Sequence, residues 1–259
     1  MILPLESKTA LVTGAAKGIG RGIAVELARS GCDVAVNDFG DAQGAAETVA
    51  LVRGLGREAF SIQADVGNAL AVRGMFEEVR GRFARLDLLV NNAGCQVWKP
   101  LLDLEEAEWD RVIDTNLKGC FLCTQQAGRW MKETGGGRIV NIGSGCNRIP
   151  FPGLVSYTAS KGGIEMFTKV AAAELGRFGI AVNCVAPGAV EVERTKLEAD
   201  DYAGMWGART PLGRVGRPED IARAVVFFAG SGAEFVTGQT LWVDGGLFTR
   251  PSWPYPEES

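Results

Sequence analysis

Three side chains in the second half of the chain could together move a proton to or from a substrate oxygen. Tyr157 and Lys161 stand four residues apart, so a helix would present both on one face, and Ser144 precedes Tyr157 by thirteen residues. A phenol, with an ordinary pKa of about 10, is a poor base at neutral pH, but a neighbouring ammonium group favours its ionised form. These three residues predict acid–base catalysis by Tyr157, with the Ser144 hydroxyl hydrogen-bonded to the carbonyl or alkoxide oxygen of a substrate. The alternative for Tyr157 and Lys161 is an ordinary solvated helix face.

The absence of histidine further narrows the catalytic chemistry that the chain could perform. The chain contains no histidine, which excludes a His-dependent triad, a His-ligated zinc ion and imidazole acid–base catalysis. Six cysteines are scattered along the chain, and only Cys120 and Cys123 have Cys-x-x-Cys spacing. That pair falls inside a helical pattern rather than at a strand-to-helix turn, so we interpret both as buried thiols. We expect no metal site.

A glycine-rich segment near the N-terminus predicts a binding site for a phosphate-bearing cofactor. It joins an expected strand at 9–13 to an expected helix at 18–30. Glycine there permits a sharp turn and close approach of a ligand, and the N-terminus of the next helix attracts an anion such as a pyrophosphate. A plain connector is the alternative. The cofactor-binding residues expected in this segment are Gly14, Lys17, Gly18, Ile19 and Gly20.

Expected strands and helices, which must position these residues, alternate along the chain. Apolar strand patterns occur at 9–13, 33–37, 58–62, 86–91, 138–142, 181–185 and 240–243, and helical patterns at 18–30, 41–55, 68–84, 105–133, 156–178 and 218–230. Strands without polar alternation, each followed by a helix, indicate a parallel sheet covered on both faces. We predict a single α/β domain over residues 1–259, in which the charged, irregular segment 190–217 is a substrate lid.

Polar residues that follow the second and fourth strands are expected to contact the same cofactor, because ligands bind at the carboxyl ends of parallel strands. Asp38 could accept hydrogen bonds from a ribose diol. The short residues after the fourth strand, Asn92, Ala93 and Gly94, permit backbone contact. An ordinary turn is the alternative at each position. Because Asp38 would repel the 2′-phosphate of NADP more strongly than exposed Lys17 would attract it, we expect NAD rather than NADP.

Composition limits the kinds of partner that the chain could bind and the cellular compartment in which we expect it. The chain has 259 residues, 46% of them hydrophobic, and a net charge of −4. It has no basic run, which argues against nucleic acid or an anionic membrane as partner. No apolar run reaches the roughly 18 residues of a membrane span, and the first residues do not resemble a signal peptide. We therefore expect a cytoplasmic protein that acts on a small molecule.

Together, these motifs resemble those of the classical short-chain dehydrogenases/reductases over nearly the whole chain. The matching residues, in chain order, are the glycine turn from Thr13 to Gly20, Asn91 to Gly94, Asn116, Ser144, Tyr157 with Lys161, and Pro187 with Gly188. The resemblance implies a Rossmann fold with a doubly wound, seven-stranded parallel sheet flanked by helices. It also implies that Tyr157 is the acid/base, Lys161 holds the nicotinamide ribose, Ser144 orients substrate and Asn116 supports a water-linked proton relay.

The resemblance further implies cofactor contacts that the spacing alone does not suggest. Contacts to adenine are implied for Asp65 and Val66, and contacts to the nicotinamide for Pro187, Gly188 and the backbone of Val190. One position departs from the family pattern. The family often places Thr four residues beyond Gly188, where this chain has Val192. A hydroxyl contact to the nicotinamide carboxamide is therefore not expected from that position.

A narrower resemblance concerns the substrate. Segments 149–152, 157–163 and 244–252 are similar to those of the aldose (glucose) 1-dehydrogenases, although such loops recur among polyol dehydrogenases and acyl-carrier reductases. We expect a sugar or polyol, whose hydroxyl groups would pair with polar side chains. Met205 and Trp206 of the lid could instead line an apolar groove. The substrate-binding residues expected are Ser144, Gln96, Asn147, Tyr157 and Glu191, with Trp98 nearby.

The last nine residues suggest an assembly. The tail 251–259 carries Trp253, Tyr255 and three prolines, and is too apolar to be left in water. We expect it to rest on a neighbouring subunit of a homotetramer, as in related enzymes.

These observations predict an oxidoreductase that transfers hydride between NAD and a secondary alcohol or lactol. Two alternatives stay open. One is an NADPH-dependent reductase of 3-oxoacyl thioesters carried on acyl carrier protein. The other is a non-catalytic NAD(P)-sensing regulatory protein, against which the joint presence of Ser144, Tyr157 and Lys161 argues.

Overall fold

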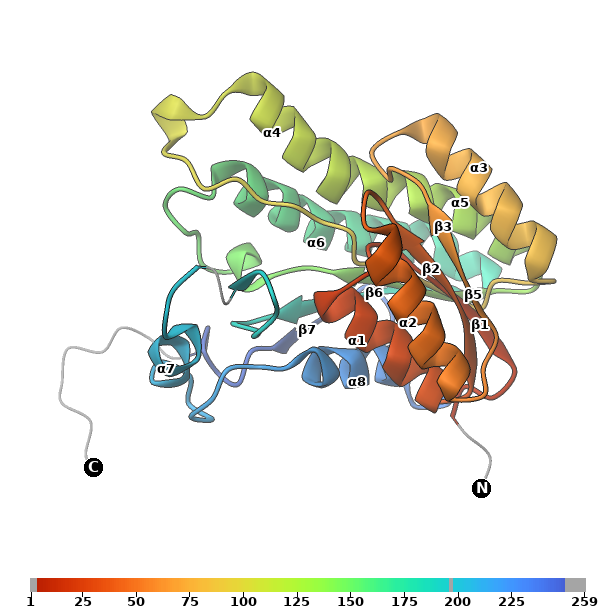
Figure 1. The fold of residues 1–259 in the computed structure, drawn as a ribbon. Helices are drawn as coiled ribbons and strands as arrows, with labels where there is room; N and C mark the ends of the chain where they lie inside the picture. The colour runs from red at the N-terminus through yellow and green to blue at the C-terminus, as the bar shows by residue number, and fades with distance from the viewer. Residues whose placement is uncertain (1–3, 196–197, 250–259) are drawn as a thin grey trace.

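The predicted doubly wound α/β fold is present in the computed structural model, which describes residues 4–195 and 198–249 (Figure 1). Seven strands form one parallel sheet in the order β3-β2-β1-β4-β5-β6-β7. The strands are β1 Lys8–Val12, β2 Cys32–Asp38, β3 Ala59–Gln63, β4 Leu88–Asn91, β5 Gly137–Ile142, β6 Ile180–Pro187 and β7 Thr240–Val243. The tail 251–259 lies outside the described residues.

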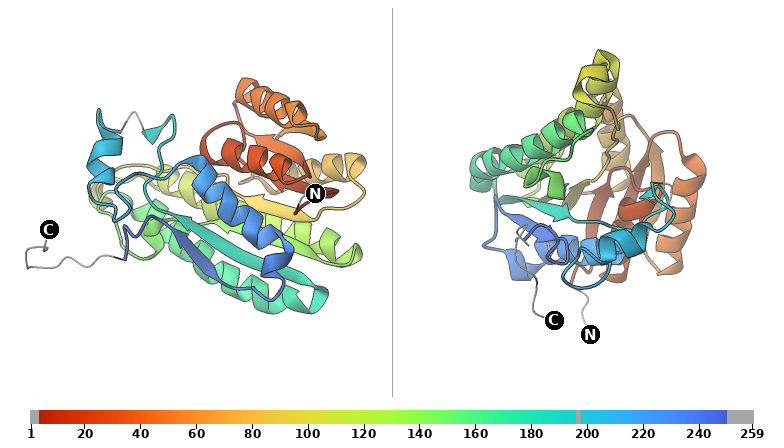
Figure 2. Two further views of the ribbon diagram at one scale, coloured as in Figure 1. Left: turned by 90° about the horizontal axis from the view of Figure 1, so that it is seen from below. Right: turned by 90° about the vertical axis from the view of Figure 1, so that its left-hand side faces the viewer.

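Helices cover both faces of the sheet, as Figure 2 shows. One layer holds α1 Gly18–Arg29, α2 Ala42–Gly54 and α8 Pro218–Ala229; the other holds α3 Ala69–Arg82, α5 Gly119–Glu133 and α6 Val155–Leu175. Strands buried on both faces explain why the sequence shows continuous apolar runs. None of the described helices is both long and apolar enough to cross a bilayer.

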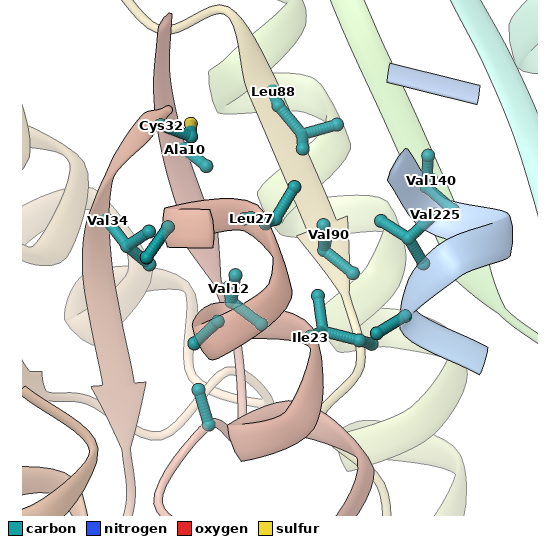
Figure 3. Close-up of a cluster of buried hydrophobic side chains, with 14 of the residues drawn as sticks. Ala10, Val12, Ile23, Leu27, Cys32, Val34, Leu88, Val90, Val140 and Val225 are labelled. Carbon is teal, nitrogen blue, oxygen red and sulfur yellow. The ribbon is translucent and has the colours of Figure 1, made fainter. Parts of the chain in front are cut away.

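Helix α1 is fixed on the sheet by a stripe of apolar side chains (Figure 3). Ile23 and Leu27, one turn apart and fully buried, pack with Val12 of β1 and Val225 of α8. Each such burial stabilises the fold by roughly 1.5–3 kcal/mol. This packing holds the N-terminus of α1 at the carboxyl edge of β1.

One predicted helix, 105–133, is interrupted. The structure has α4 Glu106–Ile113, a π-helical turn at Asp114–Lys118 and then α5. A π-turn adds a residue to one helical turn and is often found at functional sites. This turn contains Asn116, which is 1% exposed.

The segment 190–217, which we call the lid segment, is less irregular than the sequence indicates. It contains the short helix α7, Tyr202–Gly207, capped by an Asp201 side chain that accepts a hydrogen bond from the Gly204 N–H (2.9 Å). The two ends of the segment are joined by backbone hydrogen bonds. The Glu191 N–H donates to the Gly216 oxygen (2.9 Å), and the Gly216 N–H donates to the Ala189 oxygen (2.8 Å).

Candidate active site

The N-terminus of α1 is open to an anion. Its N-cap residue, Lys17, makes no side-chain cap, and its first turn holds no acidic residue, whereas α2 and α3 are capped by Asp41 and Asn68. The first N–H groups of a helix have no acceptor within the helix. An uncapped end carrying those donors and the positive pole of the helix dipole suits a pyrophosphate.

The predicted glycines shape a cradle that side chains would fill. Gly14 and Gly18 have φ angles of +61° and +56°, which favour glycine. A Cβ on Gly14 would lie 2.8 Å from the Ala93 Cα, and one on Gly20 would collide with the Gly14 oxygen. The Asn92 amide donates to the Thr13 and Gly14 oxygens (2.9 and 3.0 Å) and so ties the loop after β4 to this turn. The residues present therefore fit a dinucleotide.

Asp38 ends β2 beside the glycine turn and is 3% exposed. Its Oδ2 accepts a hydrogen bond from the Asp41 N–H (3.1 Å), which fixes the carboxylate. The Lys17 ammonium lies 2.8 Å from Asp41 Oδ2, and its hydrogen bond to Asp41 holds the pKa of that carboxyl below its usual value. Lys17 is thus already paired with one carboxylate, while Asp38 lies where the ribose of a dinucleotide is expected.

Asp65 and Val66 follow β3, the neighbour of β2 in the sheet. Asp65 Oδ1 accepts a hydrogen bond from the Gly67 N–H (2.8 Å), and Val66 is buried against Gly119. The adenine contacts implied for these two residues stay a prediction.

The catalytic candidates meet where β5 ends against α6. Lys161 is 3% exposed, and its ammonium donates to the Ile142 oxygen at 2.7 Å. The same ammonium lies 5.5 Å from the centroid of the Tyr157 ring. Two residues beyond Ile142, Ser144 Oγ accepts a hydrogen bond from the Cys146 N–H (3.2 Å). This bond uses a lone pair of the Ser144 hydroxyl oxygen, so the hydroxyl can still donate its proton to a substrate oxygen.

Asn116 is joined to Tyr157 through a residue to which the sequence analysis assigned no role. The Asn116 amide donates to the Cys95 oxygen (3.0 Å) and to Ser160 Oγ (2.9 Å), and its oxygen accepts from the Cys95 N–H (2.8 Å). The buried Ser160 hydroxyl in turn donates to the backbone carbonyl oxygen of Tyr157 (2.7 Å). The Asn116 side chain is thus committed to positioning, and its implied part in a proton relay stays a prediction.

The end of β6 brings the expected nicotinamide contacts together. A Cβ on Gly188 would lie 2.7 Å from the Asp244 Cα, so only glycine fits there. Val192, which departs from the family pattern, lies against Gly18 of the glycine turn. Its N–H donates to Thr195 Oγ1 (2.9 Å), and the Thr195 hydroxyl lies 3.1 Å from the Val190 oxygen. Thr195, a residue not singled out from the sequence, therefore holds this backbone.

Two predicted substrate residues are engaged by protein carboxylates. The Gln96 amide donates to Glu198 Oε1 of the lid segment (3.3 Å), and the Asn147 amide donates to Glu165 Oε2 on α6 (3.3 Å). The Asn147 oxygen is buried without a partner among the described residues. Trp98 is 55% exposed. The structure thus places neither amide free beside Tyr157, and their substrate contacts stay a prediction.

The lid segment contributes a tyrosine that was not predicted. Tyr202 is 8% exposed, and burial raises its pKa to about 12. The nearby Glu198 carboxylate and Tyr157 act in the same direction, while Arg194 and the Val190 backbone oppose it. Tyr202 therefore stays a neutral phenol near Tyr157 at physiological pH.

The predicted buried thiols are confirmed. Cys120 and Cys123 lie on α5 and are 4% and 0% exposed, respectively. Burial raises the pKa of Cys120 to about 12 and that of Cys123 still further. Neither forms a reactive thiolate at neutral pH.

Comparison with known proteins agrees with this geometry. A family model described as enoyl-(acyl carrier protein) reductase matches residues 14–248. The 3-oxoacyl-[acyl-carrier-protein] reductase of Staphylococcus aureus is 43% identical over 93% of this chain and 98% of its own. The (2S)-[(R)-hydroxy(phenyl)methyl]succinyl-CoA dehydrogenase subunit of Thauera aromatica is 40% identical over 93% and 97%.

A solved structure shows the same fold with a cofactor bound. The gluconate 5-dehydrogenase of Burkholderia cenocepacia, in complex with NADP and tartrate, has a TM-score of 0.90 and 35% identity, covering 96% of this chain and 98% of its own. The extent and identity of these matches establish the family. The chain belongs to the short-chain dehydrogenase/reductase family and is an oxidoreductase that acts on CH–OH groups.

Proposed function

We propose that the chain is an NAD-dependent dehydrogenase that interconverts a secondary alcohol or lactol with the corresponding ketone or lactone. A nicotinamide dinucleotide, when bound, supplies or accepts the hydride. Tyr157 would exchange the proton with the substrate oxygen, Ser144 would hold that oxygen, and the Lys161 ammonium would favour the phenolate. These three groups leave no reason to prefer the non-catalytic alternative.

The observation that carries the NAD assignment is the fixed carboxylate of Asp38. At an effective dielectric of about 20, like charges about 4 Å apart repel by about 4 kcal/mol, which would act against a 2′-phosphate beside Asp38. Lys17, in the glycine turn, is exposed and paired with Asp41, so it contributes at most about 1 kcal/mol, and the Arg21 guanidinium is held by the Ala16 oxygen and by Glu47. Repulsion should therefore decide the preference.

We expect kcat/KM to be about 100-fold or more higher with NAD than with NADP. Asp38→Asn keeps an acceptor for the Asp41 N–H but removes the charge, so it should reduce this ratio at least tenfold. The measurement is initial-rate kinetics at 340 nm with both cofactors. Asp33→Asn, at the opposite end of β2, is the matched control and should leave the ratio unchanged. Equal use of both cofactors by the unmodified enzyme would contradict the assignment.

The substrate class is less constrained than the reaction. The sugar or polyol expected from the sequence stays a proposal, but two of the three polar residues on which it rests, Gln96 and Asn147, are held by Glu198 and Glu165. The second candidate, a 3-oxoacyl thioester, is supported by the named activities of the two relatives and by Met205 of the lid segment, which is 50% exposed. Rates with aldoses, polyols, simple secondary alcohols and 3-oxoacyl thioesters would separate the classes.

A homotetramer, also expected from the sequence, is part of the proposal. Phe121 of α5 and Met166 and Val170 of α6 are 43%, 59% and 55% exposed, and Phe121 contacts Phe167 edge to face. Such an apolar face suits a contact between copies of the chain.

Met166→Glu should therefore lower the assembly state measured by size-exclusion chromatography with light scattering. It would place charges on opposing copies in an apolar contact, which is unfavourable. Leu102→Glu, at a more exposed apolar position before α4, is the control and should change nothing. A monomeric unmodified protein would refute the proposal.

A further inference from the structure

Four aromatic side chains from three separate segments form a continuous row, which we call the aromatic row. Its members are Phe248, after β7; Phe151, after β5; and Trp206 and Tyr202, on α7. Ring centroids are 6.1 Å apart for Phe248 and Phe151, 6.2 Å for Phe151 and Trp206, and 6.2 Å for Trp206 and Tyr202. The first two pairs meet edge to face, the arrangement that the quadrupole of an aromatic ring favours.

The two ends of the aromatic row flank the catalytic hydroxyls. The Phe248 ring lies so close to Gly145, the residue after Ser144, that a Cβ there would collide with it. At the other end, Tyr202 interacts electrostatically with Tyr157. The row therefore spans from the Ser144 loop to the lid segment.

The middle of the row is partly exposed, while the amide N–H groups of Gln96 and Asn147 already have protein acceptors. Phe151, Trp206 and Phe248 are only half-buried. Gln96 and Asn147 already donate to Glu198 and Glu165. A substrate hydroxyl would have to compete with these carboxylates for the two amides, whereas a flat apolar group needs no polar partner.

We propose that the aromatic row is the specificity wall of the substrate site and that it selects secondary carbinols bearing an aryl or similarly flat, unsaturated group next to the reacting carbon. Edge-to-face contact with Phe151 and Trp206 would hold that group, while Ser144 and Tyr157 address the oxygen. This inference rests on the proposed function and specifies its substrate class.

A matched pair of ligands tests the inference without requiring turnover. Acetophenone and cyclohexyl methyl ketone share the carbonyl and the six-membered ring, but only the first is aromatic. Cyclohexyl has the larger apolar surface, so burial alone would favour it. With the full chain loaded with NAD, which cannot reduce a ketone, isothermal titration calorimetry should show about tenfold tighter binding of acetophenone, as expected from one or two ring contacts.

Variants separate a substrate wall from simple packing of the lid segment. Trp206→Leu keeps an apolar side chain and should reduce the preference for acetophenone to about twofold or less, with binding of cyclohexyl methyl ketone changed less than threefold. Phe235→Leu, fully exposed beyond α8, is the control and should keep the tenfold preference. Equal affinities in the unmodified chain, or an undiminished preference in Trp206→Leu, would overturn the inference.

Failure of the inference and failure of the proposed function are distinguishable. If secondary alcohols reduce NAD but the aryl and cyclohexyl ligands bind equally, only the inference fails. If acetophenone is preferred but no secondary alcohol reduces NAD, the wall exists and the proposed reaction is wrong. A chain that binds no NADH overturns both.

Discussion

Tyr157→Phe should lower kcat by at least about 100-fold while leaving NAD binding within threefold of the unmodified enzyme. Phenylalanine keeps the ring and its position near the Lys161 ammonium but removes the hydroxyl that we propose exchanges a proton with the substrate oxygen. General acid–base catalysis typically accelerates a reaction by about 10²–10⁴-fold, which sets the size of the loss. Steady-state rates at 340 nm and NADH fluorescence titration measure the two quantities.

The hydrogen bond to the Tyr157 backbone should survive this substitution. Ser160 bonds the Tyr157 carbonyl oxygen, not its hydroxyl, so the link to Asn116 persists in the variant. An unchanged melting temperature would confirm that only the hydroxyl has been lost. Near-normal turnover in Tyr157→Phe would rule out the mechanism, whatever the substrate.

Lys161→Met should damage both cofactor binding and turnover, because one ammonium group serves two sites. We expect a rise of about tenfold or more in the dissociation constant for NAD and a fall of at least about 100-fold in kcat. The side chain is buried, donates to the Ile142 oxygen and lies beside the Tyr157 ring. Methionine fills a similar volume but supplies neither the charge nor the hydrogen bond.

Lys169→Met is the matched control, two turns further along α6. That lysine is exposed and pairs with Glu165 at 3.1 Å, so its loss should change neither constant by more than about twofold. If Lys161→Met altered only the KM for substrate, the dual role would be wrong. Comparable effects of both variants would indicate a general influence of positive charge on α6 instead.

The sheet was predictable because its signals are local. Apolar runs and the glycines between β1 and α1 report burial and backbone conformation at their own positions, and all seven predicted strands are present to within two residues at each start or end. The π-turn around Asn116 was not predictable in this way. It is associated with bonds to Cys95 and Ser160, which are distant in the sequence.

Contacts between residues distant in the sequence also limited what could be predicted about substrate binding, and more strongly than for the fold. Polar side chains such as Gln96 and Asn147 suggested a hydrophilic ligand, but their partners, Glu198 and Glu165, are 102 and 18 residues away. Likewise, the aromatic row joins residues from three loops with no shared sequence pattern. A side chain's type indicates what it can bind, but only the fold decides whether a protein group already occupies it.

The joined ends of the lid segment have a consequence for how such enzymes diverge. Because backbone hydrogen bonds link Glu191 and Ala189 to Gly216, the intervening residues form a closed excursion from the framework. Changing the length of such an excursion alters its closure entropy only logarithmically, so doubling it costs about 0.6 kcal/mol. We therefore expect the sheet to tolerate insertions, deletions and exchanges between Thr195 and Gly216, whereas Val192, which lies against Gly18, ties the start of the segment to the dinucleotide cradle. Exchanging that stretch between relatives should then alter the substrate range while leaving the fold intact.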